Sequence, residues 1–441
     1  MSKRGSEVSQ LVPGLTYREL VDAAMRHRTE ASFRNSAFFC THGAALERLL
    51  LTPRVEAPDD IGDGRGAGIA TDRVGGAAVI VAEQVGGAAR ADRRDVALPG
   101  AASLRVLQWN IERGKELEGI IRRLREDPWM CRADLLLLNE VDCGTARGGN
   151  DDQARRLAEA LGMHHAWLPT YIECTKGIGV ELDAEGENSL GLHGLAILSR
   201  WPITAARAVA LPCCHDYFDF HEKRFGGRRG LYTLIMAGNR RLVAATTHLE
   251  VRNTPRCRAR QFAAFLRGLD ESLGAWARGG LLGGGASHIS AAPPVGVILG
   301  GDWNTNTFQR GTVVRSVTEF LRLVTTAAET LAEQLVAPFS REPLFDILAA
   351  EGFAVEPCNE AVPTVSQDLG SVEDLAALPA SLARGIDRAF GLSGRILRMR
   401  LDWIAVRGLR ARGRAVTLSA AGPDGRALSD HAAIGIDLEE C

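Results

Sequence analysis

The sequence lacks the features that would place it in several large protein classes. No apolar run approaches the roughly 18 residues that a transmembrane helix needs, and no apolar stretch follows the polar start of the chain, which argues against a secretory signal. The nine cysteines are scattered, with one adjacent pair at Cys213 and Cys214 and no CxxC pattern. We therefore expect reduced thiols and a protein of the cytoplasm, not a disulfide framework or a zinc module.

An excess of charge of one sign is also missing. The chain has 52 basic and 54 acidic residues, giving a formal net charge of -2. Such a balance produces no global positive field for nucleic acid, although it leaves room for a local basic patch. Hydrophobic residues make up 46% of the 441 residues, which is enough to build one large core or two ordinary ones.

Composition divides the chain into three parts. Residues 1–55 show helical spacing of apolar positions and predict a helical N-terminal extension. Residues 56–100 are rich in glycine and alanine, which is typical of a linker. Residues 101–441 alternate strand-like and helix-like runs and predict an α/β domain, with insertions at about 275–294 and 307–397. The second insertion contains helical stretches that suit a cap or side lobe.

Polar side chains stand where apolar, strand-like runs stop or begin. Catalytic groups gather at strand ends in α/β sheets, so we expect these side chains to meet in one cleft. Carboxylate and amide oxygens suit Mg²⁺, and imidazoles can stabilise a developing oxyanion. Together they fit metal-assisted attack of water on a phosphate ester. The residues concerned are Asn110, Glu140, His248, Asp302, Asn304, Asp402, Asp430 and His431.

Short segments around these residues resemble the endonuclease/exonuclease/phosphatase superfamily, which includes deoxyribonuclease I-like nucleases, abasic-site endonucleases, neutral sphingomyelinases, inositol polyphosphate 5-phosphatases and deadenylases. Any one segment is a weak signal, but all of them occur in the order that the family uses. The resemblance implies a four-layer α/β/β/α sandwich, in which two sheets lie face to face with helices outside. The matching segments are residues 108–111, 139–142, 194–200, 247–250, 301–304, 401–404 and 429–431.

The resemblance also implies how a metal and the attacking water are held. Mg²⁺ or Mn²⁺ would be bound mainly by Glu140, with Asn110 and Asp430 close by. Asp302 would orient and activate the water, and Asn304 would hold that water or the phosphate.

The histidines are the second part of the implied site. His431 would contact a non-bridging phosphate oxygen, and Asp402 would fix its tautomer. His248 would be a second phosphate ligand or the general acid. The family histidine at this position often has an upstream carboxylate partner, and spacing alone does not choose among Glu173, Glu181 and Glu187.

Basic residues and further histidines receive more modest interpretations. Arg228 and Arg229 lie in a locally basic segment and are candidates for binding the substrate phosphate, although a solvated loop is an equally good interpretation of that segment. Trp303 and Trp403 are expected in the core. We interpret the remaining histidines as incidental because they lack metal-ligand spacing: His164, His165, His193, His215 and His221.

Two classes of function follow. The first is a metal-dependent phosphodiesterase or phosphomonoesterase, whose substrate is a nucleic acid, a lipid head group or a small phosphate ester. The alternative is a catalytically inactive binding or scaffold module on the same fold. The enzyme is favoured because every position expected to bind the metal or the water is occupied by a residue that can do so. The sequence leaves open the substrate and the oligomeric state.

Overall fold

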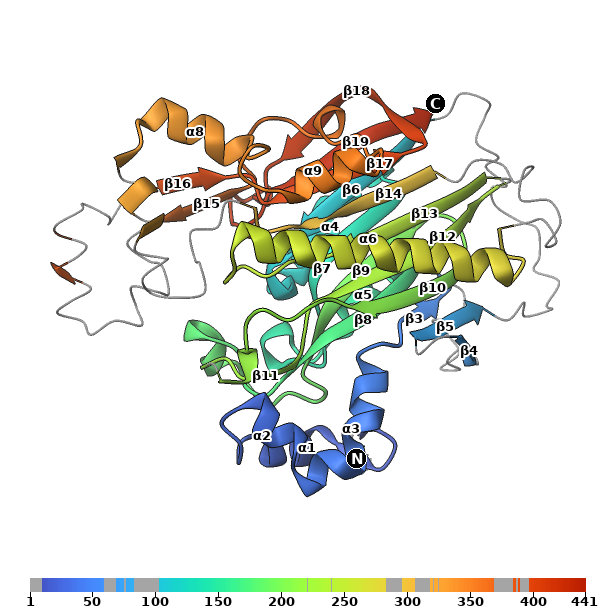
Figure 1. Ribbon diagram of the computed structural model, residues 1–441, viewed down its shortest axis with the longest axis vertical. Helices are drawn as coiled ribbons and strands as arrows, with labels where there is room; N and C mark the ends of the chain where they lie inside the picture. The colour runs from blue at the N-terminus through green and yellow to red at the C-terminus, as the bar shows by residue number, and fades with distance from the viewer. Residues whose placement is uncertain are drawn as a thin grey trace.

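Two β-sheets lie face to face and carry helices on their outer surfaces, as the computed structural model shows (Figure 1). This is the four-layer α/β/β/α arrangement that the sequence predicted. Among the described residues, no helix is long and apolar enough to cross a membrane. The structure describes residues 10–58, 69–74, 77–82, 103–219, 221–238, 240–282, 296–305, 318–319, 321–323, 325–368, 384–385, 388 and 396–441.

The first sheet contains the two parallel strands that carry part of the predicted site. β6 (Leu104–Asn110) pairs in parallel with β7 (Leu135–Cys143), and α4 (Leu117–Glu126) joins them. The four consecutive leucines of β7 are buried, as expected for a strand covered on both faces. The other strands of this sheet are β3 (Arg54–Glu56), β8 (His164–Glu173), β9 (Leu192–Ser199), β11 (Arg224–Gly226), β18 (Leu409–Leu418) and β19 (Ala433–Glu440).

The second sheet contains the predicted hairpin of β12 (Arg229–Ala237) and β13 (Arg240–Thr247). β14 (Gly296–Asp302) pairs with β13, and β17 (Asp402–Arg407) pairs with β14. The strand that ends at Asp302 and the strand that begins at Asp402 are therefore neighbours. The other side of the hairpin continues through β10 (Ile203–Ala210).

Part of the predicted linker belongs to this second sheet. β4 (Ile69–Val74) and β5 (Ala77–Ala82) form an antiparallel pair, and β5 pairs with β10. The prediction of a linker over residues 56–100 is therefore wrong for these two strands. The glycine-rich composition hid the short β-branched run Val79-Ile80-Val81, a residue type that favours strands. The other described residues of that range are 56–58.

Three hydrophobic clusters separate the layers. The one between the sheets contains side chains from both, such as Val106 and Ile298. A second lies outside the first sheet, under α4 and α5 (Gln153–Leu161). The third lies outside the second sheet, where α6 (Pro255–Arg278) and α9 (Leu344–Ala350) pack and where Trp303 and Trp403 are buried as predicted.

The described parts of the long insertion lie near the C-terminal strands. They include α8 (Ala328–Val336), α9 and a two-stranded sheet of β15 (Val365–Asp368) and β16 (Ile396–Met399). Figure 1 shows α8, β15 and β16 together at one end of the sandwich. Most of residues 369–395 of the long insertion, and most of the shorter insertion, lie outside the described residues.

The N-terminal extension is helical, as predicted, and packs on the first sheet. Its helices are α1 (Tyr17–Ala24), α2 (Glu30–Arg34) and α3 (Ala37–Leu49), and a small pair of β1 (Gln10–Val12) and β2 (Leu15–Thr16) precedes them. The fully buried Phe33 stacks on Phe218 and meets Phe225 edge-on. These aromatic contacts attach the extension to the α/β domain.

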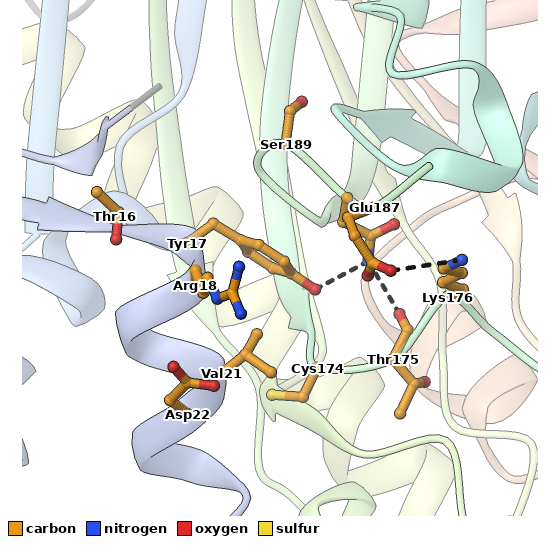
Figure 2. A pocket seen from close by; sticks show the side chains of 11 residues that line it. Thr16, Tyr17, Arg18, Val21, Asp22, Cys174, Thr175, Lys176, Glu187 and Ser189 are labelled. Carbon is orange, nitrogen blue, oxygen red and sulfur yellow. Dashed lines mark hydrogen bonds and ion pairs between the residues drawn. The ribbon is translucent and has the colours of Figure 1, made fainter. Parts of the chain in front are cut away.

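A polar contact reinforces that attachment at a hollow of about 540 Å³ beside α1. Figure 2 shows Tyr17 pointing across it toward the segment that carries Glu187 and Ser189. The Tyr17 hydroxyl donates to the Glu173 carbonyl (2.7 Å) and accepts from Asn188 Nδ2 (2.8 Å). The hollow is separate from the predicted site, because none of the residues at the strand ends lines it.

We expect Tyr17→Phe to lower the free energy of unfolding by about 0.5–1.5 kcal/mol, since it removes both hydrogen bonds and keeps the ring. Urea unfolding measures this difference. Asp22→Ala, an exposed change on the same helix, is the control and should leave stability unchanged. An unaltered midpoint in the Tyr17 variant would show that these hydrogen bonds do not stabilise the docked extension.

Candidate active site

The strand ends that carry the predicted residues meet at one end of the two sheets. Asn110 ends β6, Asp302 ends β14, and the Asn110 Nδ2 donates to Asp302 Oδ2 across the sheets at 3.2 Å. The buried Asn139 joins the sheets as well, because its Oδ1 accepts from the Asp302 backbone N–H (2.7 Å) and its Nδ2 donates to Thr246 (3.1 Å). The sequence did not identify this role for Asn139.

Asp302 lies at the centre of the cluster. Its Oδ2 is 3.3 Å from His248 Nε2 and 3.7 Å from His431 Nε2, and its Oδ1 accepts the Asn304 N–H at 2.9 Å. Burial raises the pKa of Asp302 to about 7; His431 opposes the shift and Asp402, its partner across β14 and β17, adds to it. A carboxyl group with this pKa can take up and release a proton near neutral pH.

His431 and Asp402 form a buried imidazole–carboxylate pair. His431 Nδ1 donates to Asp402 Oδ2 at 2.7 Å, while the other Asp402 oxygen accepts from Gln108 Nε2 at 3.2 Å. Burial disfavours the imidazolium, but Asp402, Asp430 and Asp302 outweigh it and raise the pKa of His431 well above its usual range. The pair therefore presents a charged Nε2–H toward Asp302.

His248 has the opposite electrostatic character. Burial and the nearby Arg228 guanidinium lower the pKa of His248 well below its usual range. Its neighbours are Asp302 and Glu140, whose Oε1 lies 3.9 Å from His248 Nδ1. A neutral imidazole here can donate its one N–H to an oxygen, but it is a much weaker proton donor than an imidazolium.

The three carboxylates offered as partners of His248 are paired elsewhere. Glu173 contacts Arg147 and Arg224, and Glu181 contacts Arg113 and Lys115. The exposed Glu187 is 3.7 Å from Lys176. All three carboxylates therefore form ion pairs with basic side chains, and spacing along the chain could not predict these pairs.

Glu140 stands at an irregular point of β7. Its φ of 58° lies in the left-handed region, and the pairing of β7 with β9 shifts register around it. Such a conformation is costly for a residue other than glycine and is commonly found at functional sites. Asn110 Nδ2 lies 3.3 Å from Glu140 Oε1, and Arg113 Nε lies 3.9 Å from Oε2. The backbone thus turns this carboxylate toward the end of β6 and the other residues of the cluster.

The two remaining acidic and amide candidates occupy different positions. Asn304, also at positive φ (50°), is buried and donates from Nδ2 to the Leu249 carbonyl at 2.8 Å. The side chain of Asp430 is 57% exposed, with Oδ1 4.0 Å from His431 Nε2. Asp430 therefore lies at the rim of the cluster and Asn304 at its floor.

The structure separates the two arginines predicted to bind phosphate. Arg228 lies over Tyr171 and Tyr217, and its charge acts on His248. Arg229 donates to the carbonyls of Thr170 and Gly227, and its charged neighbours are Glu30, Glu47 and Arg34 of the N-terminal extension. Only Arg228 is thus brought toward the cluster, together with two tyrosines that the sequence could not place.

A second imidazole–carboxylate pair lies near Glu140 and His248. His193 Nδ1 is 2.8 Å from Asp142 Oδ1, and both side chains are buried. The interpretation of His193 as incidental is not supported by this placement, since His193 acts electrostatically on both Glu140 and His248. The sequence held one positional signal for this pair: Asp142 follows Glu140 by two residues, and His193 lies at the start of the buried strand, one residue after Leu192.

The donor set fits a hydrated divalent cation better than an enclosed one. Among the described residues, no group of three or more His, Cys, Asp or Glu side chains is arranged to hold a metal ion. Mg²⁺ commonly binds through one or two carboxylates and keeps several waters. Asp402 and Glu140 both act to raise the pKa of Asp302, after burial, which is the largest cause, so several acidic side chains place negative charge at this point. A cation next to Glu140 would balance it.

Comparisons with known proteins identify the family of this chain. No curated protein is similar enough in sequence to match. Solved structures to which this chain is similar include the human Nocturnin catalytic domain with bound sulfate (17% identity, TM-score 0.43, 77% of this chain and 95% of that one). Another is a functionally unknown conserved protein from Enterococcus faecalis V583 (13%, 0.41, 77% and 100%). The sequence matches the model of the Endonuclease/Exonuclease/phosphatase family over residues 107–431. Because this match covers most of its 441 residues, the chain belongs to the endonuclease/exonuclease/phosphatase family.

Proposed function

We propose that this member of a family of phosphate-ester hydrolases cleaves its substrate with the help of Mg²⁺ or Mn²⁺. The observation that carries the proposal is the environment of Asp302. A buried carboxyl group with a pKa of about 7 has two imidazole nitrogens at 3.3 and 3.7 Å, one on a neutral ring and one on a charged ring. Such a set suits the removal of a proton from water and the stabilisation of charge on phosphate oxygens.

Each side chain has a distinct task in this proposal. Asp302 accepts the proton of the attacking water, and Asn110 and His248 hold its carboxylate in place. His431, held by Asp402, donates a charge-assisted hydrogen bond to a non-bridging phosphate oxygen. Glu140, with Asn110 and Asp430 nearby, would hold the cation. When bound, that cation would polarise the phosphoryl group and balance the developing charge.

A substrate panel tests the proposal. Purified protein is incubated with Mg²⁺, Mn²⁺ or EDTA and offered bis-(p-nitrophenyl) phosphate, DNA and RNA oligonucleotides, sphingomyelin vesicles and inositol phosphates. We expect cation-dependent release of phosphate or alcohol from at least one class, and loss of that activity in EDTA. If the folded protein turns over none of them, the inactive binding module becomes the better explanation.

Metal binding itself can be measured without turnover. We expect Glu140→Gln to weaken Mg²⁺ or Mn²⁺ binding by more than about 100-fold, the upper end of the cost of losing an outer-shell partner. Isothermal titration with Mn²⁺ gives the affinity. Glu112→Gln, a change at a neighbouring carboxylate paired with Lys115, is the matched control. Equal affinity of the Glu140 variant and the native protein would remove Glu140 as the main ligand.

A further inference from the structure

The imidazole of His193 lies between the two sheets. His193 shares a face of β9 with Leu195 and Ile197, because alternate residues of a strand point the same way. Those two side chains belong to the core between the sheets. His193 lies near the start of the strand and therefore beyond them, at the end where Glu140 and His248 are found.

Asp142 fixes the orientation of this imidazole. Asp142 and His193 are direct partners across β7 and β9, and their side chains meet at 2.8 Å. Arg147 Nε and Thr145 Oγ1 hold Asp142 Oδ2 at 2.8 and 2.9 Å. The carboxylate therefore accepts from Nδ1 and leaves Nε2 as the nitrogen available for chemistry.

His193 is also the imidazole that lies apart from the water-activating carboxylate. Asp302 has His248 at 3.3 Å and His431 at 3.7 Å, whereas no ion pair within 4.0 Å joins it to His193 among the residues that the structure describes. In an in-line displacement, the leaving oxygen departs opposite the attacking water. A proton donor for that oxygen must therefore lie away from Asp302.

We propose that His193, oriented by Asp142, is the general acid that protonates the leaving oxygen. This inference rests on the proposed hydrolase function. The water oxygen forms a bond to phosphorus and passes its proton to Asp302, while the bond from phosphorus to the leaving oxygen breaks and that oxygen takes the Nε2 proton of His193. Solvent then removes the proton from Asp302 and restores the one on His193.

The titratable and charged groups around His193 are Asp142, Arg147, Glu140, Tyr171 and His248.

The test varies the leaving group. Aryl methyl phosphates, from p-nitrophenyl to unsubstituted phenyl, are hydrolysed by the native protein, His193→Gln and Asp142→Asn with saturating Mg²⁺. A p-nitrophenolate leaves readily without a proton, whereas a phenolate needs one. We expect His193→Gln to lose less than about 10-fold in kcat on the nitrophenyl ester and about 10²–10⁴-fold on the phenyl ester. Asp142→Asn should show the same pattern with smaller losses. His164→Gln, at the other end of β8 from Glu173, is the control and should match the native protein.

The outcomes separate the two proposals. An equal loss on every ester, or no loss, overturns the role of His193 while leaving the hydrolase intact, because a merely structural histidine does not alter the dependence on the leaving group. If the native protein hydrolyses none of the esters and none of the panel substrates, the hydrolase proposal fails and the role of His193 falls with it. Circular dichroism and the Mn²⁺ affinity of each variant establish that folding and metal binding are retained.

Discussion

Asp302→Asn is expected to lower kcat for bis-(p-nitrophenyl) phosphate by about 10³-fold while leaving the protein folded. The amide has the shape of the carboxyl group and keeps an oxygen for the Asn304 N–H, but it cannot accept a proton from water. Losses of about 10²–10⁴-fold are usual when a general base is removed. Steady-state kinetics with saturating Mg²⁺ measure the effect.

The same substitution should stabilise the metal-free protein. The pKa of Asp302 is raised from 3.8 to about 7 by burial, so the folded state holds this proton more tightly than the unfolded state. Its contribution to stability is therefore full below about pH 4, falls as the pH rises from about 4 to 7, and then stays level. The asparagine of the variant does not ionise, so the variant should be more stable at pH 8 by about 2–4 kcal/mol.

Urea unfolding in EDTA at pH 4 and pH 8 checks this second effect, and Asp346→Asn, an exposed change on α9, is the control. If Asp302→Asn loses activity and gains stability at pH 8, the native carboxyl group serves chemistry at a cost in stability. Retention of more than about a tenth of the native kcat would exclude Asp302 as the base, because removal of a general base costs at least about 10²-fold.

Asp402→Asn is expected to lower kcat by about 10²–10⁴-fold. Asp402 accepts the Nδ1 hydrogen of His431 at 2.7 Å, and its charge is the largest of those that raise the pKa of His431 against burial. An asparagine removes that charge and permits the other tautomer, a change that is very costly in other catalytic imidazole–carboxylate pairs. The imidazole should then be neutral over more of the pH range.

Nuclear magnetic resonance titration of His431 distinguishes this mechanism from simple damage. We expect its pKa to fall in Asp402→Asn and to stay unchanged in Asp437→Asn, which loses a carboxylate paired with Arg105 near the other end of β19. If the two variants had similar kcat values, Asp402 would have no special role in orienting His431.

The candidate site could be predicted because its chemistry coincides with strand ends. Asn110, Glu140 and Asp302 each close an apolar run, and such ends converge whenever two strands join one sheet or two sheets pack face to face. The pattern of the sequence does not indicate which basic side chain will form an ion pair with which carboxylate. Glu173 and Glu181 were therefore open candidates until Arg147 and Arg113 were seen beside them.

The errors have a common physical origin in tertiary context. Arg228 and Arg229 are adjacent in sequence, but alternate residues of extended chain point to opposite sides, so only one of them can face the cluster. The pairing of His193 with Asp142 could not be predicted from spacing because the two residues are 51 positions apart. The glycine-rich stretch before residue 100 contains strands β4 and β5, whose partner β10 begins at Ile203.

The edge of the first sheet shows that the unit that folds is larger than the unit that the family shares. β3 pairs along β8 from His165 to Trp167, and the aromatic side chain of Phe33 covers Phe218 and Phe225 nearby. Both β3 and α2, together with β19 inside the sheet, lie outside residues 107–431. A fragment trimmed to the shared region would expose unpaired backbone donors and acceptors at strand edges, so we expect it to associate with other chains more readily than the full chain does.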